Sequence, residues 1–239
     1  DGTDNDCDTD TFGNCAITGE FDASEGNAVF YSTGSGDNIG IAVAGAGDIN
    51  GDGYDDLLIS ATGDDGAANN AGATYLVLGP TSGELFLDED ADGVFTGETK
   101  ADFAGTAVSG VDDLDGDGYA DFVIAAPNNE SDGTETGRAY FFEGPVSGTT
   151  SLADADVIIH GGSDDSSLGS AVALLGDVDN DGAPDVGIGA SRYSGSSSNA
   201  GAAYILYGPV NSSDSASAAS GATILGTETN IRFGSAIAS

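Results

Sequence analysis

The sequence predicts an all-β fold built from repeated units of four short antiparallel strands, and two observations carry that prediction. First, a nine-residue aspartate-rich segment occurs three times, beginning at Asp48, Asp113 and Asp177, so the copies are 65 and 64 residues apart. Second, the apolar residues between these segments fall in runs of four to seven, rich in β-branched and aromatic side chains. Runs of this kind, bounded by Gly, Asn, Asp or Pro, are typical of strands and are too short for ordinary helices.

The rest of each unit repeats in the same register as the aspartate-rich segment. A Gly lies eight residues before each first Asp, and a Gly-Pro pair follows each segment. These landmarks are Gly40, Gly105 and Gly169, then Gly79-Pro80, Gly144-Pro145 and Gly208-Pro209. Gly234 falls 65 residues after Gly169, so a fourth unit begins there. Self-similarity at a fixed period indicates a repeat architecture.

Each unit is expected to contain four strands, the first entering the aspartate-rich segment and the second leaving it. In the first unit they are predicted at Ile41–Ala46, Leu57–Ala61, Thr74–Leu78 and Gly93–Thr96. In the third unit they are predicted at Ser170–Leu175, Asp185–Ala190, Ala203–Tyr207 and Ala222–Leu225. A leading strand near Ala28–Ser32 and one in the trailing segment give about fourteen strands in all. Four strands per repeat is the pattern of a β-propeller blade.

The predicted fold is therefore a β-propeller-like array of about three and a half blades, fewer than the usual 4–8 of a closed propeller. We place the repeats within 21–239, with units at about 27–92, 93–156 and 157–221 and a truncated fourth at 222–239. Three interpretations remain open. The chain is part of a larger propeller, which we favour, or it completes a ring with another copy, or it stacks as an open solenoid with covered ends.

The charge balance excludes several classes of function. The 239 residues include 41 acidic and only 4 basic side chains, for a net charge of −37. So few cations cannot form the surface that nucleic-acid phosphates require, and anionic membranes would repel the chain. No apolar run approaches the ~18 residues of a spanning helix. Asp outnumbers Glu by 32 to 9, and Asp is the usual carboxylate of turns and tight calcium loops.

The aspartate-rich segments follow the pattern D-x-[DN]-x-D-G-x-x-D, which predicts a calcium loop. Positions 1, 3 and 5 place side-chain oxygens inside a tight turn, Gly at position 6 permits the reversal, position 7 offers a carbonyl and position 9 closes the shell. This supplies the six or seven oxygens that calcium prefers. The predicted ligands are Asp48, Asn50, Asp52, Tyr54 and Asp56; Asp113, Asp115, Asp117, Tyr119 and Asp121; and Asp177, Asp179, Asp181, Ala183 and Asp185.

Other interpretations of these segments are less favoured. Oxygen-only ligation argues against zinc or copper, which would recruit His or Cys. Magnesium resists full dehydration and demands a stricter octahedron. An EF-hand loop runs to a Glu at position 12 between helices, whereas these segments end at position 9 between strands. Three copies in register also disfavour simple Asx turns in an acidic protein.

These residues resemble the FG-GAP repeat of integrin α-subunit propellers and related bacterial surface proteins. The matching pieces are Phe233-Gly234, Gly47 through Gly53, Ala125-Ala126-Pro127 and Gly189-Ala190-Ser191. In the three earlier units another residue replaces the Phe of the Phe-Gly pair, which gives Ile39-Gly40, Ala104-Gly105 and Leu168-Gly169. The resemblance covers about 27–239 and implies propeller blades whose hairpins each hold calcium, in secreted or cell-surface adhesion proteins.

The amino-terminal segment, residues 1–20, forms a separate acidic region. Asp4, Asp6, Asp8 and Asp10 alternate around Cys7. The string is similar to acidic, Cys-containing calcium motifs of bacterial secreted proteins and thrombospondin type 3 repeats. A fourth calcium site near Asp4, Asp6 and Asp8 and a solvated acidic tail both remain open. Two cysteines and no others favour a Cys7–Cys15 disulfide, in keeping with an oxidising compartment.

The sequence favours a binding module over an enzyme. His160 is the sole His, so a Ser-His-Asp triad or a His-based metal centre has nothing to build on, and we interpret it as a strand residue. The leading hypothesis is an extracellular scaffold, made rigid by calcium, for cell-surface adhesion or for recognition of a protein or glycan. The alternatives are a subunit of a calcium-dependent extracellular fibre or sheath built from copies of the chain, and a non-catalytic domain of a larger secreted enzyme.

Overall fold

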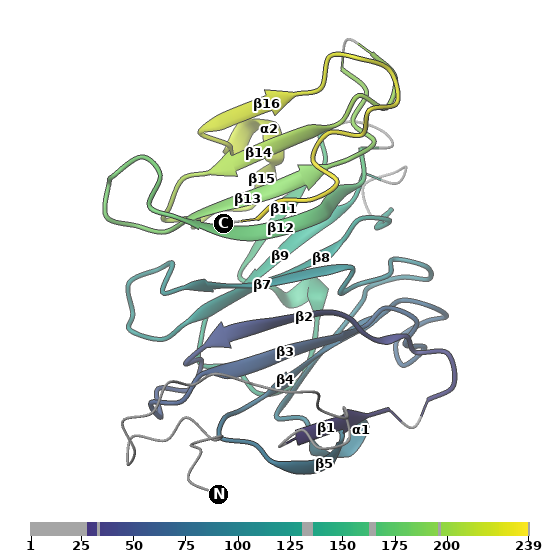
Figure 1. Cartoon of the computed structure of the whole chain (residues 1–239), viewed down its shortest axis with the longest axis vertical. Coiled ribbons are helices and arrows are strands. Elements are labelled where there is room, and N and C mark those ends of the chain that lie inside the picture. Colours follow the sequence, from purple (N-terminus) through teal and green to yellow (C-terminus); the bar gives the residue numbers. More distant parts are fainter. Residues whose placement is uncertain (1–27, 33, 131–135, 163–165, 196, 239) are drawn as a thin grey trace, which may run out of the picture.

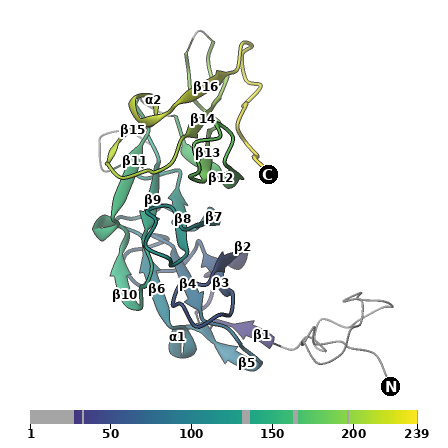
Figure 2. The ribbon, with the colours of Figure 1, turned by 90° about the vertical axis from the view of Figure 1, so that its left-hand side faces the viewer.

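Three sheets, each containing four antiparallel strands, stand side by side along the molecule and form a curved row; two of them gain a fifth, parallel strand (Figures 1 and 2). The computed structural model describes residues 28–32, 34–130, 136–162, 166–195 and 197–238. A leading strand, β1 (Ala28–Tyr31), precedes three repeats. In the first repeat lie β2 (Ile39–Gly47), β3 (Asp56–Ala61), β4 (Ala73–Val77), β5 (Gly83–Phe86), α1 (Leu87–Asp90) and β6 (Gly93–Thr96).

The second and third repeats have the same order of elements. The second contains β7 (Ala107–Asp112), β8 (Asp121–Ala126), β9 (Arg138–Phe142), β10 (Gly148–Ser151), the 3₁₀ turn η2 (Leu152–Asp154) and β11 (Val157–His160). The third contains β12 (Leu168–Gly176), β13 (Asp185–Ala190), β14 (Ala202–Leu206), β15 (Asp214–Ser215), α2 (Ala216–Ala219) and β16 (Ala222–Leu225). We call β2-β3-β4-β6 blade 1, β7-β8-β9-β11 blade 2 and β12-β13-β14-β16 blade 3.

The four-stranded blades confirm the fold class expected from the sequence, and the predicted strand ends differ from the observed ones by at most two residues. The leading strand is also present, as β1. The strand expected in the trailing segment is absent from its described residues, 226–238, where Phe233 makes an isolated parallel bridge with Gly201. In each blade the first strand is held by pairing with the second strand, which follows the aspartate-rich segment. Residues 226–238 contain no aspartate-rich segment and no second strand, so a first strand there has no such partner.

A fifth short strand in each repeat was not predicted. It follows the Gly-Pro turn and forms a parallel pair with an earlier strand: β10 pairs with β6 and β15 with β11, the outermost strands of the preceding blades, and β5 pairs with the leading strand β1 (Figure 2). These strands carry little hydrophobic pattern, as the sequence Gly-Thr-Thr-Ser of β10 illustrates. Each repeat is thereby tied to its predecessor at the outer edge of the row.

Apolar layers between the blades hold the row together. Between blades 1 and 2, Phe95 of β6 contacts Phe122 of β8 and Phe142 of β9, with ring centroids 5.0 and 4.7 Å apart. Between blades 2 and 3, Val123 and Ile188 belong to another buried cluster. Aromatic pairs at such distances add to the stabilisation that burial of their area provides.

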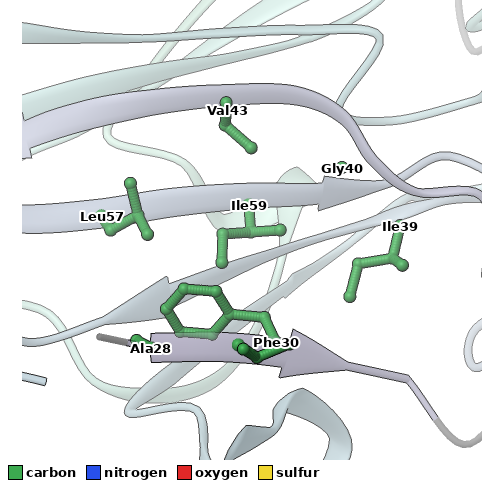
Figure 3. A pocket seen from close by; sticks show the side chains of 8 residues that line it. Ala28, Phe30, Ile39, Gly40, Val43, Leu57 and Ile59 are labelled. Carbon is green, nitrogen blue, oxygen red and sulfur yellow. The ribbon is translucent and has the colours of Figure 1, made fainter. Parts of the chain in front are cut away.

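The outer face of blade 1 has no blade against it among the described residues. Val43 on β2 is 62% exposed, whereas Val108, at the same repeat position in blade 2, is 9% exposed. An open pocket of about 360 Å³ lies here, lined by Phe30, Val43, Leu57 and Ile59 among others (Figure 3). Phe30 comes from β1, which reaches across one side of this apolar face.

Candidate metal centre

The three aspartate-rich segments form hairpin loops at the same end of their blades. Loop 1 (Asp48–Asp56) joins β2 to β3, loop 2 (Asp113–Asp121) joins β7 to β8, and loop 3 (Asp177–Asp185) joins β12 to β13. These connections lie on one side of the row in Figure 1. The repeat register therefore places the three candidate sites next to one another.

The first Asp of each loop bends the chain around its own carboxylate. In loop 2, Asp113 Oδ1 accepts hydrogen bonds from the N–H groups of Gly116 and Asp117 at 2.7 and 3.0 Å. Its Oδ2 accepts from the N–H of Gly118 at 3.0 Å. Asp48 of loop 1 makes the same three bonds, and Asp177 of loop 3 makes the bonds to positions 5 and 6. The loop thus closes around the carboxylate at position 1.

Positions 3 and 5 bring their oxygens to the same place. The side chain of Asp115 accepts from the N–H of Asp117, and that of Asp117 accepts from the N–H of Tyr119, both at 2.9 Å. As a result, carboxylate oxygens of Asp113, Asp115 and Asp117 all lie within 4.8 Å of one another. The group Asp177, Asp179 and Asp181 in loop 3 meets the same criterion.

Loop 1 replaces one carboxylate with an amide. Asn50 Oδ1 accepts from the N–H of Asp52 at 2.9 Å, as the Asp at this position does in the other loops. The backbone of loop 1 therefore matches that of loop 2, with one negative charge fewer among positions 1, 3 and 5.

The Asp at position 9 is buried and has a second, structural role that the sequence did not reveal. Asp121 is 1% exposed; its Oδ2 accepts from the N–H of Leu114 at 2.7 Å and its Oδ1 from that of Gly144 at 2.9 Å. Asp56 and Asp185 make the corresponding pairs of bonds. Position 9 therefore ties the loop to the distant Gly-Pro turn. Its role as a ligand remains a prediction, because it does not join the groups of converging oxygens.

The electrostatics of the loops match a site for a cation. Burial, opposed by hydrogen bonds from Gly144 and Leu114, raises the pKa of Asp121 to about 6, with smaller contributions from the charges of Asp115 and Asp113. Burial, with the same kinds of opposing bonds, also raises the pKa of Asp56. Carboxylates this close repel one another unless a cation lies between them. Oxygens alone suit a hard cation such as calcium, so the donors of all three loops fit that ion.

Other predicted sites fall elsewhere. Asp4, Asp6, Asp8 and the pair Cys7 and Cys15 lie outside the described residues. His160 ends β11, in agreement with its interpretation as a strand residue, and its Nδ1 lies 3.2 Å from the Gly161 carbonyl oxygen.

Comparison with known proteins assigns part of the sequence to a repeat family. A family model of the FG-GAP repeat matches residues 40–77 and 104–142, which contain loops 1 and 2. The chain contains FG-GAP repeats. Blade 3 lies outside the matched residues but has the same strand order and the same bonds at position 9 as the two matched FG-GAP repeats.

Curated relatives of these FG-GAP repeats include integrin α chains and a phospholipase. The chain is 31% identical to integrin alpha-PS2 of Drosophila melanogaster over 176 residues, which cover 68% of this chain and 12% of that protein. It is 34% identical to phosphatidylinositol-glycan-specific phospholipase D of Bos taurus over 157 residues, 63% of this chain and 18% of that protein. It is 33% identical to human integrin alpha-6 over 124 residues, 52% of this chain and 10% of that protein. The chain thus spans less than a fifth of each relative.

None of the helices in the part of the chain that the structure describes is long and apolar enough to cross a bilayer.

Proposed function

We propose that this chain is a non-catalytic, extracellular module whose FG-GAP repeats bind calcium and form a rigid scaffold for adhesion or recognition at a cell surface. One observation carries the proposal: carboxylate oxygens of Asp113, Asp115 and Asp117 converge within 4.8 Å, and the same positions converge in loop 3. Loop 1 offers the same backbone with Asn50 at position 3. The likeness to integrin α chains supports an adhesive role and an extracellular location.

The loops would stabilise the blades through their own side chains. Without a cation, the oxygens at positions 1, 3 and 5 repel one another. With calcium bound there, that repulsion becomes attraction, and the first two strands of the blade are held by a closed loop. Asp121 and its counterparts accept hydrogen bonds from the Gly of the Gly-Pro turn, so an ordered loop also holds that turn in place. The resulting rigid row would present its other polar loops, such as 63–72, to a protein or glycan partner.

Calcium titration tests the proposal directly. Isothermal titration should find three sites, and Asp52→Ala, Asp117→Ala and Asp181→Ala should each remove one. Calcium bound only to the folded state raises the free energy of unfolding by about 2.7 kcal/mol per site at one hundred times Kd. A thermal melt that EDTA leaves unchanged would contradict a structural role for calcium.

The face of blade 1 that no other blade covers among the described residues favours a second candidate function, in which copies of the chain assemble into a fibre or sheath. Val43 is 62% exposed beside the pocket lined by Phe30 and Leu57. A further blade, supplied by another copy, would bury this face as blade 1 buries Val108. Light scattering with and without a chelator tests this: a calcium-dependent increase in mass supports assembly, and a monomer at all concentrations contradicts it.

The likeness to phospholipase D supports the third candidate, a non-catalytic domain of a larger secreted enzyme. The gene sequence on both sides of residues 1–239 distinguishes it from the first two. An adjoining catalytic domain in the same reading frame would support it, and an integrin-like continuation would contradict it.

A further inference from the structure

Loops 1 and 2 contact each other directly. The N–H of Ala120 donates to the carbonyl oxygen of Asp48 at 3.1 Å, which joins position 8 of loop 2 to position 1 of loop 1. The ring of Tyr119 lies over Gly51, so close that a Cβ on Gly51 would be 2.7 Å from Tyr119 Cε1. Gly144 also approaches loop 1, because a Cβ there would lie 2.9 Å from the carbonyl oxygen of Ile49.

Loops 2 and 3 lack the equivalent contacts, and the reason is visible in the sequence. Position 7 of loop 3 is Ala183, which has no ring to cover Gly116, and a Cβ on Gly116 would meet nothing within 4 Å. Position 8 is Pro184, which has no N–H to donate. Within the described residues, the carbonyl of Asp113 accepts no backbone bond of the kind that Asp48 accepts.

Loop 1 also has a tyrosine at position 7, Tyr54, but no second aspartate-rich loop lies against its ring among the residues that the structure describes. Tyr54 is 55% exposed, whereas Tyr119 is half-buried against Gly51. Tyr54 and Tyr119 therefore differ in what their rings touch, although both sit at position 7 and both donate their N–H to the Asp at position 5.

We infer that Tyr119 is a positioning residue that couples cation binding in loops 1 and 2, whereas loop 3 binds independently. The inference rests on the proposed calcium binding. Tyr119 belongs to both sites: its N–H donates to Asp117 of loop 2, its carbonyl is a predicted ligand there, and its ring rests on loop 1. Ordering loop 2 fixes Tyr119 and Ala120, so loop 1 loses less conformational freedom when it binds in turn. The coupling is reciprocal, because each site must favour the other by the same factor.

The coupling is measured by calcium titration of loop 1 in the Asp181→Ala protein, where only loops 1 and 2 contribute. Removing the loop 2 site with Asp117→Ala should raise the Kd of loop 1 by about fivefold or more, the usual lower range of coupling between sites. In a Tyr119→Ala background the same removal should change that Kd by less than about twofold. The matched control is Tyr54→Ala, which keeps its position 7 carbonyl and should retain the full effect.

The outcomes separate this inference from the proposed function. Equal, independent affinities at three calcium sites overturn the coupling and leave calcium binding intact. Coupling that survives Tyr119→Ala overturns the role of Tyr119. A protein that binds no calcium at any loop overturns both. If Tyr119→Ala fails to fold, two other variants still test the coupling between loops 1 and 2. Asp117→Ala should weaken calcium binding by loop 1, and Asp181→Ala alone should leave the calcium affinity of loop 1 unchanged.

Discussion

Blades 1 and 2 are built from the same repeat, yet corresponding residues have different surroundings. Val43 in blade 1 is 62% exposed and Val108 in blade 2 is 9% exposed. Tyr54 extends into solvent while Tyr119 lies on the neighbouring loop. In a row of repeats each unit contacts only its neighbours, and its stability is the sum of an internal part and an interface part. Comparing blades 1 and 2 therefore separates the stability that a blade gains from its own loop from the stability that it gains from contact with the preceding blade.

The largest difference is expected from a charge placed at the interface position. Val108→Asp should lower the free energy of unfolding by about 3 kcal/mol or more, because it buries an unpaired carboxylate between two blades. Val43→Asp, at the same repeat position, should stay within about 0.5 kcal/mol, because the side chain remains in water. Urea unfolding in calcium measures both. Equal losses from the two variants would mean that the face of blade 1 is covered in solution.

Removal of calcium should affect the two blades by similar amounts, because their predicted ligands differ only at position 3, which is Asn50 in loop 1 and Asp115 in loop 2. Asp117→Ala and Asp52→Ala should each cost at least about 2.7 kcal/mol at one hundred times Kd of calcium, since each loses its own site and weakens the coupled one, and almost nothing in EDTA. Asp121→Ala should behave differently, since it leaves the buried N–H groups of Leu114 and Gly144 without their acceptor, at about 1–3 kcal/mol each. That loss should persist in EDTA.

The melting temperatures of these variants, recorded with calcium and with EDTA, make the distinction. A loss for Asp121→Ala that disappears in EDTA would assign position 9 purely to metal binding. A loss for Asp117→Ala that persists in EDTA would assign position 5 to the fold. Either result would contradict the division of roles within the loop.

The parts of this structure that the sequence predicts are the parts encoded locally. Short apolar runs predict β3 and β13 because a strand buried on both faces needs a continuous run of such residues. The loop pattern predicts which oxygens of Asp113, Asp115 and Asp117 converge, because all three belong to one tight turn. The repeat spacing of 65 and 64 residues predicts that these strands and loops occupy equivalent positions in successive blades.

The parts that could not be predicted depend on neighbours distant in sequence. The strand Gly148–Ser151 is polar and is ordered by pairing with β6 of another repeat. The bond from Gly144 to Asp121 spans 23 residues, and the contact of Tyr119 with Gly51 joins two repeats. The exposure of Val43 depends on the lack of a covering blade among the described residues, which no local pattern encodes.

A smaller difference should come from the contact between the loops. Gly51 and Gly116 both have positive φ, 76° and 86°, so an Ala at either place costs about 1–2 kcal/mol in backbone strain. Gly51→Ala should cost about 1 kcal/mol more, because its Cβ would meet the Tyr119 ring at 2.7 Å. Urea unfolding measures this extra cost in three variants: Gly51→Ala, Gly116→Ala, and the double variant Gly51→Ala with Tyr119→Ala. The excess should vanish in the double variant; an excess that remains would place the clash elsewhere.

The last comparison concerns pH and involves the buried Asp at position 9 of both blades. Burial raises the pKa of Asp121 from its ordinary 3.8 to about 6, and it also raises the pKa of Asp56. In EDTA the folded protein therefore binds a proton more tightly than the unfolded chain, so the free energy of unfolding should rise as the pH falls from 7 through 6 and level off below 3.8. Asp121→Asn and Asp56→Asn should each remove part of this rise, because each replaces a carboxyl group of raised pKa with an amide that does not titrate.

In calcium the sign should reverse, because protons compete with the cation for the carboxylates of the loops. Urea unfolding at pH 7, 6 and 5, in EDTA and in calcium, measures both slopes. The slope in EDTA includes the contributions of Asp121 and Asp56, whose pKa values burial raises, and the slope in calcium reports the release of the cation from the loops. If stability in EDTA fell as the pH fell, the hydrogen bonds of Asp121 to Leu114 and Gly144 would outweigh its burial. The carboxylate at position 9 would then stabilise blade 2 in its charged form, with or without a cation in the loop.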